Sequence, residues 1–197
     1  MKRAFERTLE TSESEDVLGS LRHALACARL IEGDPHAAKW LFLALHSALQ
    51  GAFICHLVTT APPIGIISDG DAVKWHKYLR ESNRISSPQP RTFVLELPKL
   101  MSKARIPRSA GDGLNENGIS LTDDEFEWIK RLHIEVRNQF VHFSPMGWTI
   151  LLDGIPDFSR LVARIIREIL DHGHGFRHLS QHDRKELRML LDELADL

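Results

Sequence analysis

Apolar residues recur at helical spacing along most of the chain, and proline and glycine separate the segments in which they do so. We expect helices over about 12–32, 36–59, 72–81, 92–103, 122–143, 156–173 and 180–194. Capping boxes mark two of the starts, at Ser12 with Glu15 and at Thr122 with Glu125. There is no internal repeat and no alternation of strands with helices, so the pattern predicts an all-α fold.

These helices are expected to form a single domain over 1–197, an up-and-down bundle whose core comes from about 12–60 and 122–195. The segment 36–59 is apolar almost all round, which is typical of a central helix with several neighbours. Polar residues such as His46 and Gln50 interrupt it, which favours a buried helix over a membrane span. A long insertion, about 61–121, carries short helices (one with Pro98 in its middle) and the longest irregular stretch, 106–120. A short extended segment is expected at 146–152.

The composition agrees with one soluble domain. The chain has 197 residues, 43% of them hydrophobic and 26% charged, and two cysteines, both in apolar helical stretches, which excludes a disulfide framework. The N-terminal stretch lacks the apolar region of a signal peptide, so we expect a cytoplasmic protein. A net charge of −2 gives no global reason to expect nucleic-acid binding, and any such reason must come from local patches.

One stretch between Arg84 and Arg108 is clearly basic, with Glu96 as its single acid. Its meaning is either a solvated surface or a patch that faces nucleic acid. On the second interpretation the candidate RNA-binding residues are Arg84, Arg91, Lys103, Arg105 and Arg108.

The candidate site lies at the end of the helix expected over 122–143. With 100° of turn per residue, a core stripe runs along this helix through Phe126, Ile129, Leu132, Val136, Phe140 and Phe143. Asn138 and His142 share a face that points away from the stripe, Val141 lies on the same outward side, and Arg137 lies between the faces. His133 falls inside the stripe and is expected to be a satisfied core histidine. An ordinary helix end with incidental polar residues is the alternative.

Arg137, Asn138 and His142, near the end of a helix in an all-α bundle, resemble the signature of the HEPN (higher eukaryotes and prokaryotes nucleotide-binding) superfamily. That signature is an Arg, four to six residues, then a His, often with a polar residue directly after the Arg. The resemblance covers about 12–60 and 122–195 and does not extend to the insertion.

The resemblance implies a four-helix core, a homodimer whose motifs meet in a cleft, and metal-independent endoribonuclease activity in a toxin, defence or RNA-processing role. It also implies an antitoxin protein as a partner in several families. Other members have lost activity, so a catalytically silent module that binds RNA or protein is the alternative. A helical interaction protein without a nucleic-acid role is a third hypothesis.

In such a site Arg137 would hold the phosphate, His142 would transfer a proton, and Asn138 would orient His142 or bind the phosphate. His46 and Gln50 lie one turn apart and either bond each other or line this cleft. His172, His174, His178 and His182 are expected to form a polar or RNA-facing turn between helices, with a metal site as the alternative. We expect no bound metal and no cofactor.

Overall fold

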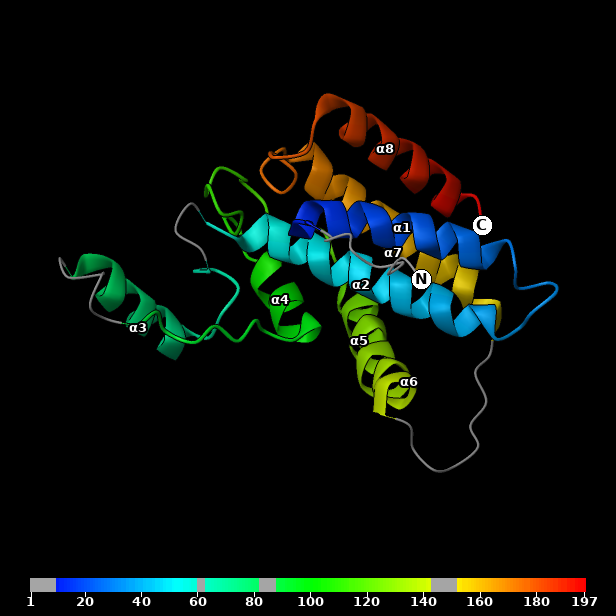
Figure 1. Cartoon of the computed structure of the whole chain (residues 1–197), viewed down its shortest axis with the longest axis horizontal. Helices are drawn as coiled ribbons and strands as arrows, with labels where there is room; N and C mark the ends of the chain where they lie inside the picture. The colour runs from blue at the N-terminus through cyan, green and yellow to red at the C-terminus, as the bar shows by residue number, and fades with distance from the viewer. Residues whose placement is uncertain (1–9, 60–62, 82–87, 143–151) are drawn as a thin grey trace, which may run out of the picture.

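The computed structural model describes residues 10–59, 63–81, 88–142 and 152–197 (Figure 1). The elements are α1 (Glu13–Ala28), α2 (Ala37–Leu57), α3 (Asp69–Arg80), α4 (Leu97–Ala104), α5 (Asp123–Arg131), a π-helix η1 (Leu132–Arg137), α6 (Asn138–His142), a 3-10 turn η2 (Leu152–Gly154), α7 (Ile155–Asp171) and α8 (Gln181–Ala195). Among the described residues there is no strand, which confirms the all-α prediction. The extended segment predicted at 146–152 lies outside the described residues except for Leu152.

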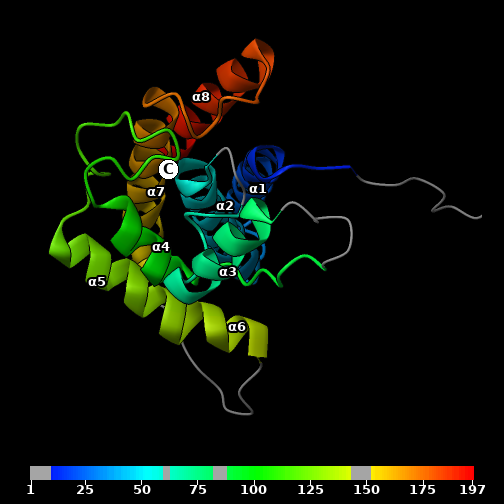
Figure 2. The same ribbon diagram turned by 90° about the vertical axis from the view of Figure 1, so that its left-hand side faces the viewer.

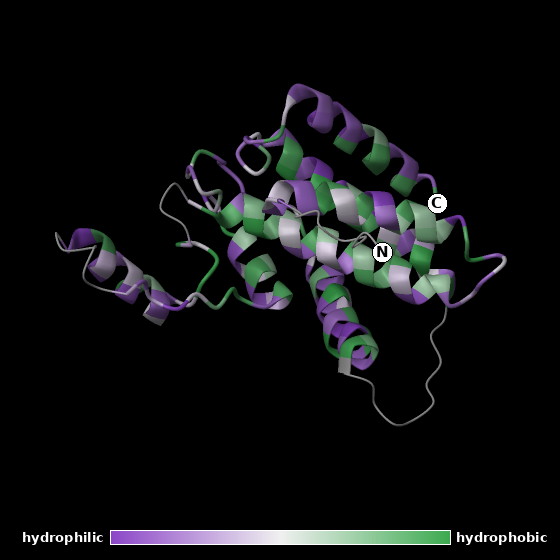
Figure 3. Cartoon of the chain, in the orientation of Figure 1, coloured by the Kyte–Doolittle hydropathy of each residue, from purple (hydrophilic) through white to green (hydrophobic). Residues whose placement is uncertain are grey.

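A ring of helices encloses the core. Two hairpins, α1 with α2 and α7 with α8, pack on each other because α2 contacts α7 and α1 contacts α8. Figure 3 shows that α8 is hydrophilic along its outer side and turns its apolar residues toward the bundle. The interior consists of apolar side chains from all of these helices, among them Leu21, Leu45, Phe53, Ile165 and Leu191.

The helix α2 is the central element, as its sequence predicts. It contacts α1, α4, α7 and η1, and most of its residues are buried. Within the described residues it is also the one helix whose length and composition would suit a membrane span, and 67% of its most apolar window is buried inside the protein. The apolar residues on every side of α2 therefore pack against several neighbouring helices.

The segment that carries the candidate site runs as one continuous rod of α5, η1 and α6. It lies outside the ring and runs crosswise to α2 (Figures 1 and 2). The rod is attached through α4, which contacts both α2 and α5, and through η1, which contacts α2 directly. One flank of α2 is consequently left open beside the rod.

The insertion has two parts. The helix α3 lies apart from the bundle at the left of Figure 1, whereas α4 packs on α2. The loop after α4 returns to the end of α2, where the Gly111 amide donates to the His56 carbonyl at 2.8 Å. The helix α4 and the loop that follows it are thus attached to α2 and form a second layer over it.

Three predicted helix boundaries are wrong. The helix α3 begins at Asp69 rather than near Ala72, because the Ser68 hydroxyl accepts from the Asp71 amide and caps the helix there. The helix α1 ends at Ala28 rather than near Glu32, because successive tight turns, such as Leu30 to Cys27 and Gly33 to Leu30, prepare the chain reversal before Pro35. The helix α4 begins at Leu97, so Pro98 lies in its first turn and not in its middle. A first-turn proline loses no helical hydrogen bond, since its amide would have no partner there.

Both predicted capping boxes are confirmed, and the one at α5 supports a measurable prediction. The Thr122 hydroxyl accepts from the Glu125 amide, and the Glu125 carboxylate accepts from the Thr122 amide. We expect Thr122→Ala to lower the free energy of unfolding by about 1 kcal/mol in urea titrations. Ser120→Ala is the control, because the bonds of Ser120 involve only its backbone. Equal losses in both variants would contradict a specific role for the cap.

Candidate functional site

A groove opens between the start of α1, the open flank of α2 and the end of the rod. Its volume is about 600 Å³. The lining residues are Thr11, Ser12, Glu13, Asp16, Leu43, His46, Ser47, Gln50, Gly51, Ile54, Arg137 and Val141. Three elements that are distant in sequence thus build one concave surface, and Arg137 from the candidate motif lies in it.

The floor of the groove is one face of α2. Leu43, Ser47, Gln50 and Ile54 follow at spacings of four, three and four residues and are partly exposed. Helical periodicity places such residues on one face. The two residues expected to line a cleft, His46 and Gln50, therefore lie in the same groove as Arg137. His46 bonds to a different residue, and no bond joins it to Gln50 among the described contacts.

Arg137 is the last residue of the π-helix η1 and is half-buried in the groove wall. A π-helix bonds residue i to i+5, so it inserts an extra residue and shifts the phase of everything after it. Single π turns inside α-helices are frequent at functional sites. The Arg137 guanidinium donates to the Asn138 side-chain oxygen at 3.0 Å, which fixes the two motif residues relative to each other.

A buried histidine pair lies against the groove wall. His46 Nε2 and His133 Nδ1 are 2.8 Å apart, and each residue is 6% exposed. Burial, followed by the charges of His133 and Arg137, lowers the pKa of His46 to about 3. Burial and Arg137 also lower the pKa of His133. The prediction of a satisfied core histidine at 133 is confirmed, and its partner supplies the reason.

The remaining motif positions belong to the short helix α6. Phe140 anchors it, with 7% exposure and its ring centroid 6.0 Å from that of Phe42 on α2. Val141 is 42% exposed and lines the groove, so its predicted outward position is confirmed. The backbone of His142 closes α6, and its side chain lies outside the described residues.

The wall opposite Arg137 is acidic. Glu13 and Asp16 come from the first turn of α1, both are exposed, and neither has a salt bridge among the described residues. Carboxylates are favoured at a helix N-terminus by the helix dipole, which gives them a structural reason. The groove therefore has a cationic side and an anionic side.

The basic stretch does not form one free surface. Lys103 binds Asp69 at 3.4 Å and the Ile67 carbonyl at 3.1 Å, and Arg105 binds Asp123 at 2.6 Å and lies over the Phe126 ring. Lys103 thus binds within the insertion, and Arg105 connects the insertion to the start of α5. Arg91 and Arg108 are exposed, and Arg84 lies outside the described residues. None of the four described residues, Arg91, Lys103, Arg105 and Arg108, lines the groove, and the role of all five in RNA binding stays a prediction.

The histidine-rich run is divided between different environments. His174 is buried and bonds the Val58 carbonyl at 2.9 Å, with Asp112 3.4 Å from its other nitrogen, whereas His172 and His178 are exposed. His174 thus ties the turn after α7 to the end of α2.

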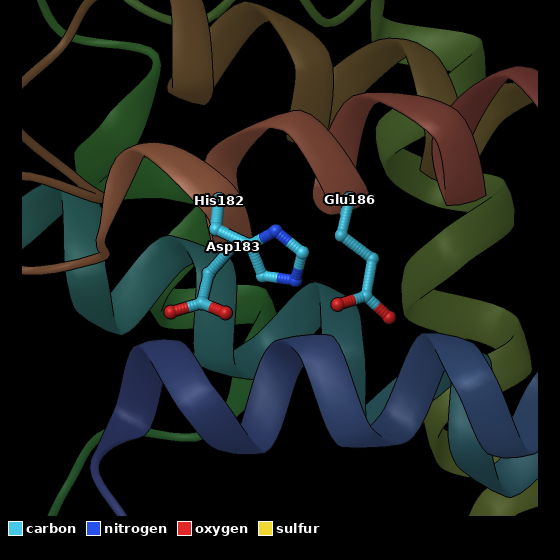
Figure 4. Close-up of side chains that lie close together, drawn as sticks. All are labelled: His182, Asp183 and Glu186. Carbon is cyan, nitrogen blue, oxygen red and sulfur yellow. The ribbon is translucent and has the colours of Figure 1, made fainter.

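His182, Asp183 and Glu186 offer ligand atoms within 4.8 Å of one another and extend from α8 toward α1 (Figure 4). Both carboxylates are already engaged. Arg22 donates to both Glu186 oxygens at 2.7 Å, and Ser180 donates to Asp183 at 2.7 Å. The Arg22 guanidinium already occupies the position beside Glu186 that a metal ion would take. This cluster is therefore a contact that pairs α1 with α8.

Several groove residues are not in the sequence-based site: Glu13, Asp16, Leu43, Ser47 and Ile54, together with His133 behind the wall. The spacing of Leu43, Ser47 and Ile54 is a signal for a shared face, but it does not reveal that this face is open.

Comparison with protein-family models, with curated proteins and with solved structures found no match for this chain.

Proposed function

We propose that this protein is a metal-independent endoribonuclease that acts through the groove at Arg137. The observation that supports it is the groove itself, where an arginine from the Arg-x4-His motif meets polar residues of α2, His46 and Gln50. An arginine in a concave, partly apolar surface is suited to holding a phosphate group of a single strand.

The proposed reaction uses the nucleophile that RNA carries. The 2′-oxygen attacks phosphorus, the bond from phosphorus to the 5′-oxygen breaks, and the products are a 2′,3′-cyclic phosphate and a 5′-hydroxyl. A base takes the proton from the 2′-hydroxyl and an acid gives one to the leaving oxygen. His142 suits either role near neutral pH, and Arg137 would stabilise the charge that grows on the phosphate.

A homodimer would complete this site. One copy offers one His142, whereas the reaction needs a base and an acid. Val141, exposed at 42% beside Arg137, is an apolar residue that a second copy would cover.

The charge of the groove limits how RNA would bind. Since Arg137 faces two acids, few phosphates can be neutralised there, and the affinity should depend only shallowly on salt. Such an enzyme would recognise one or two nucleotides at a time. A role in a toxin or defence system, with an antitoxin protein as partner, remains part of the proposal.

The test is RNA cleavage by the purified protein with a chelator present. We expect cleavage with 2′,3′-cyclic phosphate ends, and a loss of about 10²-fold or more in rate for Arg137→Ala or His142→Ala. Arg131→Ala is a matched control, because Arg131 is exposed at the end of α5 and does not line the groove.

Equal cleavage by the parent and both motif variants would refute the endoribonuclease. Binding of RNA without cleavage, lost in Arg137→Ala, would support the catalytically silent module instead. Sedimentation of the parent at micromolar concentration measures the dimer, and a monomer that cleaves at full rate would refute the composite site.

A further inference from the structure

The geometry of the His46–His133 pair behind the groove restricts the protonation states that the pair can adopt. A hydrogen bond of 2.8 Å between His46 Nε2 and His133 Nδ1 needs a proton on one nitrogen and a lone pair on the other. The bonded pair therefore holds either no net charge or one extra proton. The two rings lie nearly parallel and meet at their edges, with centroids 5.1 Å apart and an interplanar angle of 20°.

The charged groups around the pair come from each neighbouring element. Arg137 of η1 lowers the pKa of both histidines, and Glu96, which caps α4, acts in the opposite direction on His133. Glu13 and Asp16 of α1 face His46 across the groove. With burial as the largest cause, the pair is neutral at pH 7.

A negative ligand at Arg137 would shift that balance toward the protonated pair. The ligand offsets the guanidinium charge that opposes protonation, and it adds its own negative charge to the groove that His46 lines. Both changes favour an imidazolium, which the existing hydrogen bond would share between two rings. Because binding and protonation are linked, a site that gains a proton with its ligand binds more tightly as the pH falls.

We propose that Arg137 and the His46–His133 pair form one oxyanion-binding unit, which takes up a proton when it binds a phosphate group. The inference rests on the proposed function insofar as the phosphate belongs to RNA, but it concerns binding and is observable without cleavage. His46 and His133 are then positioning residues, since they reach the phosphate through charge and through Arg137.

The experiment is calorimetric titration of the full chain with a 2′-deoxyoligonucleotide, whose phosphodiesters lack the attacking hydroxyl, between pH 5 and pH 8. We expect an affinity that rises by up to about tenfold per pH unit as the pH falls, and uptake of up to one proton per site. The uptake is measured by repeating each titration in buffers of different ionisation enthalpy. Sulfate is a second ligand, because it does not titrate in this range and separates a small-anion site from one that needs a polynucleotide.

His46→Gln removes the titrating ring and keeps an amide at the hydrogen-bonding position, so its affinity should lose the pH dependence. His142 is itself a titrating group of the motif, and the comparison is therefore repeated in a His142→Gln background, where the parent pair should still take up a proton. His76→Gln is the control, because His76 is exposed on α3 and outside the groove. Ring ¹⁵N shifts of His46 and His133 in the unmutated protein give the same answer if His46→Gln fails to fold.

Undiminished proton uptake in His46→Gln, or ring shifts that ignore the ligand, would overturn the proton-coupled unit and leave the proposed nuclease standing. A parent protein that binds neither ligand at any pH would overturn the unit, and RNA cleavage would then decide the proposed nuclease separately. Proton uptake with sulfate as well as with the oligonucleotide supports the unit and assigns it to small oxyanions, whereas uptake with the oligonucleotide alone assigns it to nucleic acid.

Discussion

Lowering the pH from 6.5 to 4.5 should destabilise the fold by about 5 kcal/mol, through two buried histidines. The pKa of His46 is lowered to about 3 and that of His56 to about 4, in each case chiefly by burial, whereas unfolding returns both to the ordinary value of 6.5. Between these values the unfolded chain binds more protons than the folded one. Stability is therefore fully present above pH 6.5 and falls as the pH decreases, by about 1.4 kcal/mol per unit for each histidine.

The measurement is urea unfolding followed by circular dichroism at several pH values from 7.5 to 4.5. His46→Gln and His56→Gln should each remove about half of the slope of stability against pH. His76→Gln, at an exposed position, should leave the slope unchanged. A double variant with the parent slope would show that other groups control the acid response.

Gly111→Ala should destabilise the protein by about 3 kcal/mol or more, because the loop after α4 meets the end of α2 at backbone distance. A Cβ at this position would overlap the Val58 carbonyl oxygen and lie 2.5 Å from His174 Nε2. Relief requires the loop to move away. That movement would break the bond from the Gly111 amide to the His56 carbonyl at 2.8 Å and would separate Asp112 from His174, which are 3.4 Å apart.

The same substitution at Gly19 provides the control. Gly19 lies inside α1 with no atom within 4 Å of a Cβ, so alanine there should stabilise the helix by about 0.5–1 kcal/mol. Thermal unfolding of both variants measures the contrast. A Gly111→Ala protein as stable as the parent would mean that the loop is not fixed to α2 in solution.

The presence of each helix and most helix starts were predictable because they depend on local chemistry. Ser12 and Thr122 cap α1 and α5 with side chains three residues from their partners, and no tertiary contact is needed for that. The end of α1 and the start of α4 were not, since chain reversal at Pro35 and the first-turn position of Pro98 depend on where the neighbouring segments lie.

The candidate site was predictable only in part. The sequence identifies Arg137 and the outward position of Val141 by helical periodicity alone. It contains no marker of the π turn at Leu132–Arg137, the part of the rod that contacts α2. The partner of His133 was equally hidden, since His46 is 87 residues away in sequence.

By itself, then, the sequence determined an all-α protein, a central apolar helix and a short list of chemically suited residues. Local propensity and the periodicity of buried positions are properties of each segment, and they survive without its neighbours. Only the tertiary structure decided that α1, α2, α7 and α8 close the ring while the rod of α5, η1 and α6 lies outside it. The rod leaves one flank of α2 open, and that opening turns Arg137, His46 and Gln50 into neighbours in one groove.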